Sequence, residues 1–203
     1  DRYSRKELKV IWSEENKYKI WLKIEIAAAE AMEKYKIIPK GVSSVVKRKA
    51  KIKVKRIHDI EAKVKHDVIA FLTSITEQSG IKARYLHQGM TSSDILDTAF
   101  NIQLKQSGEI LLKDIDKILS VLKKKAKKYK FTPCIGRSHG IHAEPITFGL
   151  KLASFYEEFK RNRKRLIDAI DEVSSCAISG AVGTFANINP KVEKQVAKKL
   201  GLK

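Results

Sequence analysis

Apolar residues recur every three or four positions along most of the chain, the spacing that one buried face of an α-helix produces. Ser13 is a suitable N-cap for a first helix whose apolar positions are Ile20, Ile24, Ala27, Ala28 and Ala31. Pro39 and Gly41 predict its end. Residues 1–12 are expected to form a short arm, and further helices are expected near 42–51, 57–79, 92–130, 148–173 and from Pro190 onward.

The helix expected at 92–130 is the longest, because its apolar positions keep the three–four repeat from Ile95 to Leu122. A helix of 39 residues is roughly 58 Å long. Such a helix needs partners along its length, and neighbouring bundle helices or other subunits are the usual ones. Gly108 is a possible bend.

We find no segment with convincing strand alternation and no internal repeat, so the predicted fold class is all-α. The expected organisation is an N-terminal helical domain at 1–109, followed at 110–203 by the start of a long-helix bundle. Since Lys203 comes soon after the start of the last helix, we expect that bundle to be incomplete.

Composition adds a strong positive charge, with 42 basic and 23 acidic residues among 203 and a net charge of +19. Such an excess bears on partners and not on fold, and it fits either nucleic acid or a small anionic substrate. Because the lysines are widely spread, most are interpreted as solvated helix surface. Cys134 and Cys176 form no CxxC pattern, which fits a reducing cytoplasm. No apolar run reaches the roughly 18 residues that span a bilayer, so no membrane partner is expected.

Polar residues that can carry chemistry form three clusters. The first is Lys65-His66-Asp67, placed by the periodicity inside the helix 57–79. Neighbours on a helix point in different directions, so the three cannot reach one ligand side by side. A charged helix face before the apolar run that starts at Val68 explains this cluster equally well.

The second cluster is His87 together with Thr91-Ser92-Ser93-Asp94 at the expected start of the long helix. A helix N-terminus offers unpaired N–H groups and a partial positive charge, which suits a carboxylate or a phosphate. Thr91 and Asp94 also have the spacing of a capping box, which needs no ligand.

The third cluster lies in the stretch 136–149 and consists of Arg137, His139 and His142. Arg137 and His139 lie between two glycines, and His142 follows the second glycine by two residues. Gly136 and Gly140 permit a constrained turn between helices, and Pro145 suits the first turn of the next helix. Histidine titrates near neutral pH and suits proton transfer. Satisfied polar turn residues are the alternative, and a metal site lacks obvious third and fourth ligands. Together the clusters favour an enzyme that acts on an anionic substrate by proton transfer.

The stretches His87-Gln-Gly-Met-Thr-Ser-Ser-Asp-Ile-Leu-Asp-Thr98 and Gly136-Arg-Ser-His-Gly-Ile-His-Ala-Glu-Pro145 closely resemble the adenylosuccinate lyase family. The opening Arg2-Tyr3-Ser4-Arg5 and the stretch Lys65–Phe71 are also similar to motifs of that family, in the same order. These matches cover nearly the whole chain. They identify it as a member of the fumarase/aspartase superfamily.

The resemblance implies a homotetrameric, cytoplasmic carbon–nitrogen lyase of purine nucleotide biosynthesis that needs no metal or cofactor and shares each active site between subunits. It would release fumarate from adenylosuccinate to give AMP, and also from succinylaminoimidazole carboxamide ribotide. His139 would be the general acid, and His66 would orient it, with Lys65 and Asp67 beside it. Thr91 and Ser92 would hold the succinyl carboxylates, and the residues that face the nucleotide phosphate would be Arg2, Tyr3 and His87.

Two departures from the family pattern matter. Ser138 stands where threonine is commoner, and it keeps the hydroxyl. The Ser-Ser-x-Met-Pro-x-Lys-x-Asn-Pro motif that carries the family's general-base serine does not occur in these 203 residues. The resemblance therefore implies an N-terminal portion of the enzyme that is inactive by itself.

Two rival interpretations stay open at this point. The first is another fumarate-releasing lyase of the superfamily, similar to argininosuccinate lyase, or a carboxymuconate cycloisomerase. The second is a basic helical module that binds nucleic acid, which the net charge of +19 supports. The second rival predicts strongly salt-dependent binding to any duplex and leaves the histidine clusters unexplained.

Overall fold

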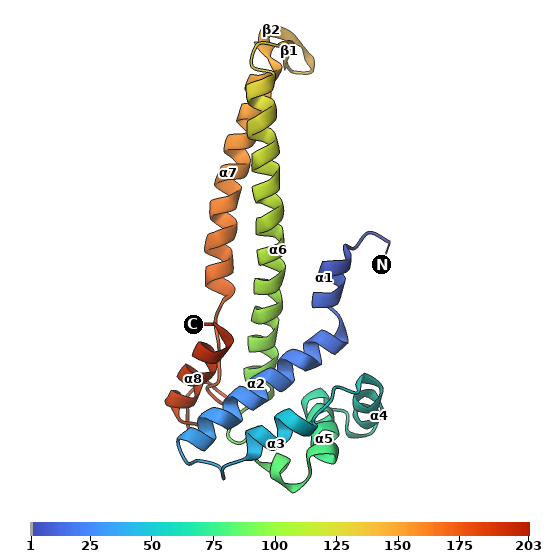
Figure 1. Cartoon of the computed structure of the whole chain (residues 1–203), viewed down its shortest axis with the longest axis vertical. Coiled ribbons are helices and arrows are strands. Elements are labelled where there is room, and N and C mark those ends of the chain that lie inside the picture. Colours follow the sequence, from blue (N-terminus) through green and yellow to red (C-terminus); the bar gives the residue numbers. More distant parts are fainter. Residues whose placement is uncertain (1) are drawn as a thin grey trace. The chain divides into compact units, whose positions relative to one another are not determined.

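The computed structural model describes residues 2–203, and its elements follow one another as helices with a single two-stranded interruption (Figure 1). The helices are α1 (Lys6–Ile11), α2 (Glu14–Lys34), α3 (Val42–Lys49), α4 (Val54–Val64), α5 (Asp67–Ser79), α6 (Ser92–Lys128), α7 (Phe148–Val173) and α8 (Pro190–Leu200). A 3₁₀ turn, η1 (Ile81–Tyr85), precedes α6, and the strands are β1 (Pro133–Ser138) and β2 (Ile141–Thr147). The prediction of a helical fold is confirmed.

Local capping explains several helix ends. The Ser13 hydroxyl accepts a hydrogen bond from the Asn16 backbone N–H at 3.2 Å and caps α2, as predicted. The Asn189 side chain caps α8, with Pro190 in its first turn. Gly80 follows the last residue of α5 with a positive φ of 74°. Residues 1–12 are not simply an arm, because they include α1.

The prediction of one helix from 57 to 79 is wrong. Lys65 adopts a left-handed conformation with φ 55° and ends α4, and His66 is extended and caps α5. His66 and Asp67 therefore lie at a junction between two helices and not inside one. A left-handed lysine has no specific sequence signal, so the apolar periodicity did not reveal the break between the two helices.

The stretch expected to be a turn before a helix is instead an antiparallel hairpin. Strand β1 pairs with β2 from Pro133↔Thr147 to Ser138↔Ile141, with an irregularity between Ile135 and Arg137. Pro145 belongs to β2, so the prediction that it opens a helix is wrong, as is the prediction of no strands. The residues of both strands nearest the turn, 137–138 and 141–145, are all exposed, so the apolar–polar alternation of a half-buried strand is absent.

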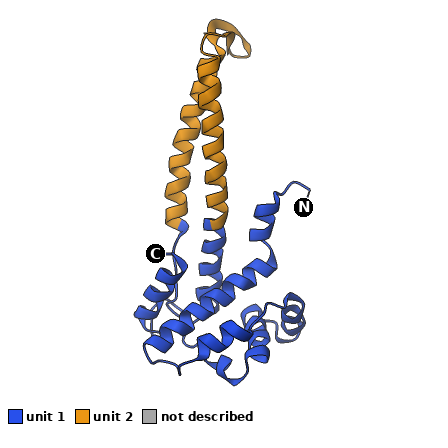
Figure 2. Cartoon of the chain, in the orientation of Figure 1, with its two compact units in different colours: residues 1–105, 173–203 blue, residues 106–172 orange. Residues whose placement is uncertain are grey.

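Two compact units divide the chain, residues 1–105 with 173–203 and residues 106–172 (Figure 2). Helix α6 begins in the first unit and continues in the second. The predicted domain limits, 1–109 and 110–203, stay a prediction about the domains of the whole protein.

The first unit contains the hydrophobic core. Tyr18 and Trp21 of α2 pack edge to face at 5.1 Å between ring centroids, and Phe71 of α5 stacks on Tyr18 at 6.0 Å. Buried aliphatic residues complete this core from every helix of the unit except α1, whose buried Ile11 lies outside the cluster. They include Ile24, Val42, Ile57, Ile75, Ile95, Val192 and Val196. Because α8 closes over α2, the last segment of the chain completes the same core as the first.

The second unit is a pair of antiparallel helical segments joined by the hairpin (Figure 1). The helices approach closely at two glycines. A Cβ on Gly108 would lie 2.5 Å from Cγ1 of Ile170, and a Cβ on Gly149 would lie 2.5 Å from the backbone oxygen of Ala126. Several apolar side chains of this unit remain exposed, among them Leu111, Val121, Leu150 and Phe155. Among residues 2–203, none of the helices is long and apolar enough to cross a membrane.

Candidate active site

Left-handed backbone conformations mark three of the predicted site residues. Among the described non-glycine residues, five have a positive φ: Lys36, Lys65, His87, His139 and Phe185. Side chains with a Cβ rarely adopt this region, and such strain is concentrated at functional sites. Lys65, His87 and His139 come from three separate sequence clusters, and the functional role of these clusters stays a prediction.

His139 occupies the first of the two residues that turn the hairpin. Its φ is 51° and that of Gly140 is 77°, the positive pair that two-residue hairpin turns require. Residues 137–142 are all exposed, so the turn presents the His139 imidazole to solvent. This is a suitable position for a group that must reach a separate substrate molecule.

The strands fix the neighbours of His139. Arg137 on β1 and His142 on β2 are register partners, so both side chains stand beside the turn. A Cβ on Gly136 would lie 2.6 Å from the backbone oxygen of Glu144, so only glycine permits this strand approach. Among the described residues, no group of three or more metal-ligating side chains gathers here or elsewhere. The absence of a metal from the proposed reaction stays a prediction.

His66 lies at the junction of α4 and α5 with a defined hydrogen bond. Its Nδ1 accepts from the backbone N–H of Ile69 at 3.3 Å. A neutral imidazole that accepts at Nδ1 carries its proton on Nε2, which makes Nε2 the donor. Asp67 places a carboxylate oxygen 3.6 Å from the same Nδ1 and accepts from the Val68 backbone N–H at 2.7 Å. The break at Lys65 thus removes the objection that three helical neighbours point apart.

His87 is held by a residue that the sequence did not indicate. Glu25 of α2 is 1 % exposed, and its Oε1 lies 2.8 Å from Nδ1 of His87. The other oxygen, Oε2, accepts from the His87 backbone N–H at 3.0 Å. The only available sequence signal was a charged residue inside the apolar stretch Ile24–Ala29.

The start of α6 has the Asp94 half of the predicted capping box, while the Asp94 backbone N–H donates to the Thr91 carbonyl at 3.1 Å and not to its hydroxyl. The Thr91 backbone N–H donates to Oδ2 of Asp94 at 2.9 Å. Thr91 and Ser92 remain half-buried at the first turn, where unpaired N–H groups and the helix dipole favour an anion. Capping by Asp94 and anion binding at Thr91 and Ser92 are compatible, because they use different groups.

The loop between α7 and α8 lies against the start of α6. Asp94 is 2 % exposed and also accepts from the backbone N–H groups of Ser179, at 3.0 Å, and Gly180, at 3.1 Å. A Cβ on Gly89 would lie 2.2 Å from the backbone oxygen of Asn187, so the turn after His87 touches the same loop. The first unit therefore gathers His87, Thr91 and Ser92 with the loop 179–187.

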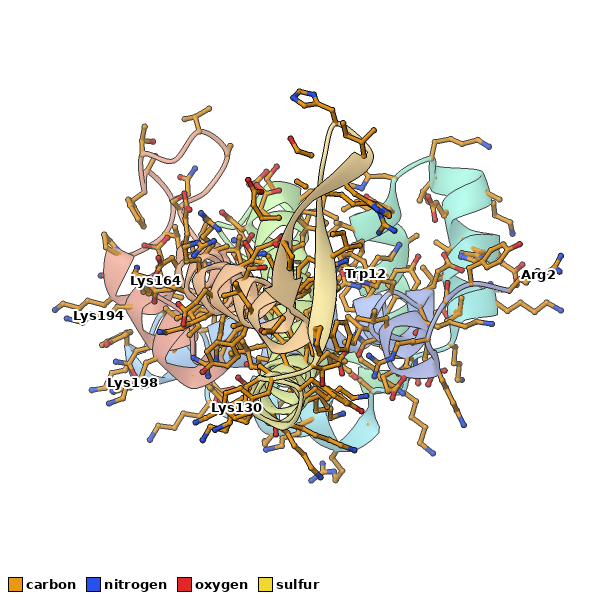
Figure 3. All side chains as sticks on the ribbon, turned by 90° about the horizontal axis from the view of Figure 1, so that it is seen from above. Arg2, Trp12, Lys130, Lys164, Lys194 and Lys198 are labelled. Carbon is orange, nitrogen blue, oxygen red and sulfur yellow. The ribbon has the colours of Figure 1, made fainter. Side chains whose placement is uncertain are left out.

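Arg2 and Tyr3 lie in the exposed segment before α1. The Arg2 guanidinium carbon stands 5.6 Å from the centre of the Tyr3 ring, and Tyr3 is 91 % exposed. Arg2 extends away from the ribbon, as do Lys194 and Lys198 of α8 (Figure 3). Tyr3 lines an open hollow with Arg5, Leu8 and Trp12. Binding of substrate by Arg2 and Tyr3 stays a prediction.

The predicted residues are divided between the units. His66, His87, Thr91 and Ser92 belong to the first, and His139 belongs to the second.

Cys176 of the first unit is no nucleophile, because burial raises the pKa of its thiol to about 11 and keeps it protonated at neutral pH.

Comparisons with known proteins agree with the fold and with the motifs. The family model described as a lyase matches residues 3–203. Adenylosuccinate lyase of Bacillus subtilis is 47 % identical over 203 residues, which are 100 % of this chain and 47 % of that protein. Adenylosuccinate lyase of Streptococcus mutans is 49 % identical over the same length and is likewise covered to 47 %. The chain spans about half the length of these curated relatives.

Solved structures show the same fold. Fumarate lyase from Mesorhizobium sp. BNC1 matches with a TM-score of 0.92 and 27 % identity, over 98 % of this chain and 50 % of that one. The β-carboxy-cis,cis-muconate cycloisomerase from Acinetobacter calcoaceticus matches with a TM-score of 0.90 and 28 % identity, over 98 % and 49 %. The match to the lyase model over nearly every residue shows that the chain belongs to this lyase family, within the fumarase/aspartase superfamily.

Proposed function

We propose that the protein is an adenylosuccinate lyase, which eliminates fumarate from adenylosuccinate to give AMP and from succinylaminoimidazole carboxamide ribotide in purine nucleotide biosynthesis. The observation that carries the proposal is the likeness of the whole chain to two adenylosuccinate lyases. The more distant superfamily structures resemble the chain in fold at lower identity.

The reaction sets two chemical requirements. The proton that is removed lies beside a carboxylate and is weakly acidic, so the negative charge that develops there needs preorganised donors. The leaving nitrogen of the purine or of its precursor needs a proton from a positioned acid. We assign the acid to His139 because the family motif implies it, and the exposure of residue 139 on the two-residue turn supports this assignment by leaving the imidazole open to a substrate.

The other site residues have supporting roles in this proposal. His66 orients or couples to His139 through the Nε2 proton that its Nδ1 hydrogen bond implies, with Lys65 and Asp67 beside it. Thr91 and Ser92 hold the succinyl carboxylates at the start of α6. At the phosphate end of the nucleotide, the proposed contacts are Arg2, Tyr3 and His87.

The proton-abstracting base is assigned to a serine outside these residues, because the family's base motif does not occur among them. We therefore expect the 203-residue chain alone to release no fumarate. We also propose a cytoplasmic homotetramer with shared active sites. The exposed apolar residues of α6 and α7 support this assembly, since other subunits would cover them.

The test is fumarate release from adenylosuccinate by the full-length gene product, with His139→Ala and a matched variant, His58→Ala. His58 is a surface histidine that pairs with Glu14. We expect activity in the wild type and in His58→Ala and a loss of 10²-fold or more, on the order expected for a general acid, in His139→Ala. Activity that survives His139→Ala would move the acid elsewhere. No activity in an intact, folded wild type would reject adenylosuccinate as the substrate.

A further inference from the structure

Glu25 is a buried charge in the middle of an apolar helix face. It is 1 % exposed and is flanked on α2 by buried Ile24 and by Ala27, Ala28 and Ala29. Burial of a carboxylate is costly unless hydrogen bonds satisfy it, and an apolar residue of similar size usually contributes as much stability. Stability alone therefore gives no reason for a glutamate at this position.

Both oxygens of Glu25 bind one residue, His87. Oε1 lies 2.8 Å from the ring nitrogen Nδ1, and Oε2 accepts from the His87 backbone N–H at 3.0 Å. The backbone of His87 is left-handed, with φ 63°, so one carboxylate holds both the strained backbone and the ring. The His87 side chain is 17 % exposed, which keeps part of the ring accessible.

The contacts of Glu25 occupy one nitrogen of the His87 ring and leave the other without a contact to Glu25. A carboxylate only accepts hydrogen bonds, so Nδ1 must carry the proton that it shares with Oε1. Nε2 is then the ring nitrogen that remains for a ligand. A phosphate only accepts hydrogen bonds, so Nε2 must carry a proton as well when it binds one, and the Glu25 carboxylate balances the charge of the imidazolium that results. Carboxylates that fix a histidine in this way act on the orientation and the tautomer of the ring.

We propose that Glu25 is the positioning residue for His87, and that it aims Nε2 at the nucleotide end of the substrate. The inference rests on the proposed function, because it names a determinant of substrate binding at the same site. Glu25 does not touch the substrate. It acts by holding the ring and the left-handed backbone that carries it.

Glu25→Gln tests the proposal sharply. An amide carries no negative charge to balance the imidazolium, and with its oxygen on the His87 backbone N–H its NH₂ group faces the protonated Nδ1. A neutral ring that accepts from this NH₂ group at Nδ1 would satisfy both contacts but would no longer carry the positive charge that a phosphate needs. We expect the KM for adenylosuccinate to rise roughly tenfold in the full-length enzyme, the effect of losing one charged hydrogen bond, with a smaller fall in kcat. Glu30→Gln is the matched control, because Glu30 lies on the same helix and pairs with Lys199 at the surface.

A double-mutant cycle separates positioning from packing. His87→Asn removes Nε2 and keeps a residue that tolerates a left-handed backbone. In this background Glu25→Gln should change KM by less than about twofold, because the group it positions is gone. A merely structural glutamate would instead have the same effect on KM in both backgrounds, which would overturn the inference.

Two further outcomes separate the positioning role from the proposed function. If the wild type is active and Glu25→Gln has the same KM as the wild type, the positioning role is rejected and the proposed function stands. A wild type that releases no fumarate would reject both. If Glu25→Gln does not fold, Glu25→Asp keeps the charge but is one methylene too short to hold both contacts, and it should raise KM in the same way.

Discussion

Asp94 and Ser179 lie 85 residues apart in the sequence, and Oδ1 of Asp94 accepts a hydrogen bond from the Ser179 backbone N–H at 3.0 Å. The second oxygen accepts from the backbone N–H groups of Thr91, at 2.9 Å, and Gly180, at 3.1 Å. One buried carboxylate thus caps α6 and fixes the loop that lies against its first turn.

Asp94→Asn should therefore lower the free energy of unfolding by about 1–3 kcal/mol, because an amide cannot accept three N–H groups from these directions. Urea unfolding measures the change. Asp97→Asn is the matched control, since Asp97 is exposed on the same helix, and it should stay within about 0.5 kcal/mol. Equal effects of the two substitutions would contradict the assigned role of Asp94.

Thr98→Val should destabilise the first unit by about 1–3 kcal/mol, because the backbone C=O and N–H of Ala177 would both lose the hydrogen bond to the buried hydroxyl. The hydroxyl of Thr98 donates to the Ala177 carbonyl at 3.2 Å and accepts from the Ala177 N–H at 3.1 Å, and Thr98 is 0 % exposed. Thr73→Val, which removes one hydroxyl bond within α5, should cost much less. Chemical denaturation of both variants compares them. Similar midpoints would argue against the role of Thr98.

Gly149→Ala should destabilise the second unit more than Gly108→Ala. At Gly149 the new Cβ meets backbone atoms of Ala126 and Lys130, which cannot rotate away, whereas at Gly108 it meets only the side chain of Ile170. Overpacking costs about 1–3 kcal/mol, and alanine returns up to about 1 kcal/mol of helix propensity at either site. Thermal unfolding gives the order, with Ser154→Ala on the exposed face of α7 as the reference. The reverse order would show that the helix backbones at Gly149 move apart more easily than the Ile170 side chain rearranges at Gly108.

Tyr18 makes the first unit sensitive to alkaline pH. Its burial, aided by the negative charges of Glu14, Glu61 and Asp67, raises the pKa of the phenol to about 12. An unfolded tyrosine ionises near pH 10. The stabilising effect of the neutral phenol is therefore complete below about pH 10 and is lost as the pH rises toward 12.

Tyr18→Phe should remove this component, so the variant should lose less stability than the wild type between pH 10 and 12. Circular dichroism and tyrosinate absorbance follow unfolding and ionisation together. Tyr3→Phe is the control, because Tyr3 is 91 % exposed. Parallel loss of stability in Tyr18→Phe and wild type would place the alkaline sensitivity in another group.

Helix positions were predictable where the ends depend on local side chains. Ser13, Gly80 and Asn189-Pro190 act on the backbone within a few residues, so the sequence alone shows them. The hairpin was missed because Gly136 and Pro145 argue against strands and because exposed strands have no alternation. The signal was the dipeptide His139-Gly140, since a residue that tolerates positive φ followed by glycine is typical of a two-residue turn.

The candidate site was predictable as a list of residues and not as a set of contacts. The family motifs indicate His66, His87 and His139, but nothing in the sequence indicates Glu25 as a partner of a residue 62 positions away. The contacts of Asp94 with the loop after α7 were hidden for the same reason. Long-range partners depend on packing, which neither periodicity nor capping determines.

The first unit is discontinuous in the sequence, and this has a consequence for folding during synthesis. Residues 106–172 leave the ribosome before 173–203 can complete the core that residues 1–105 begin. At about 5–20 residues per second the delay is on the order of ten seconds, and the second unit consists of local contacts that form much faster. Until α8 arrives, the face of α2 that it covers is open to water. We therefore expect the nascent chain to expose that face of α2 until α8 has been made, and the core of the first unit to be completed only then.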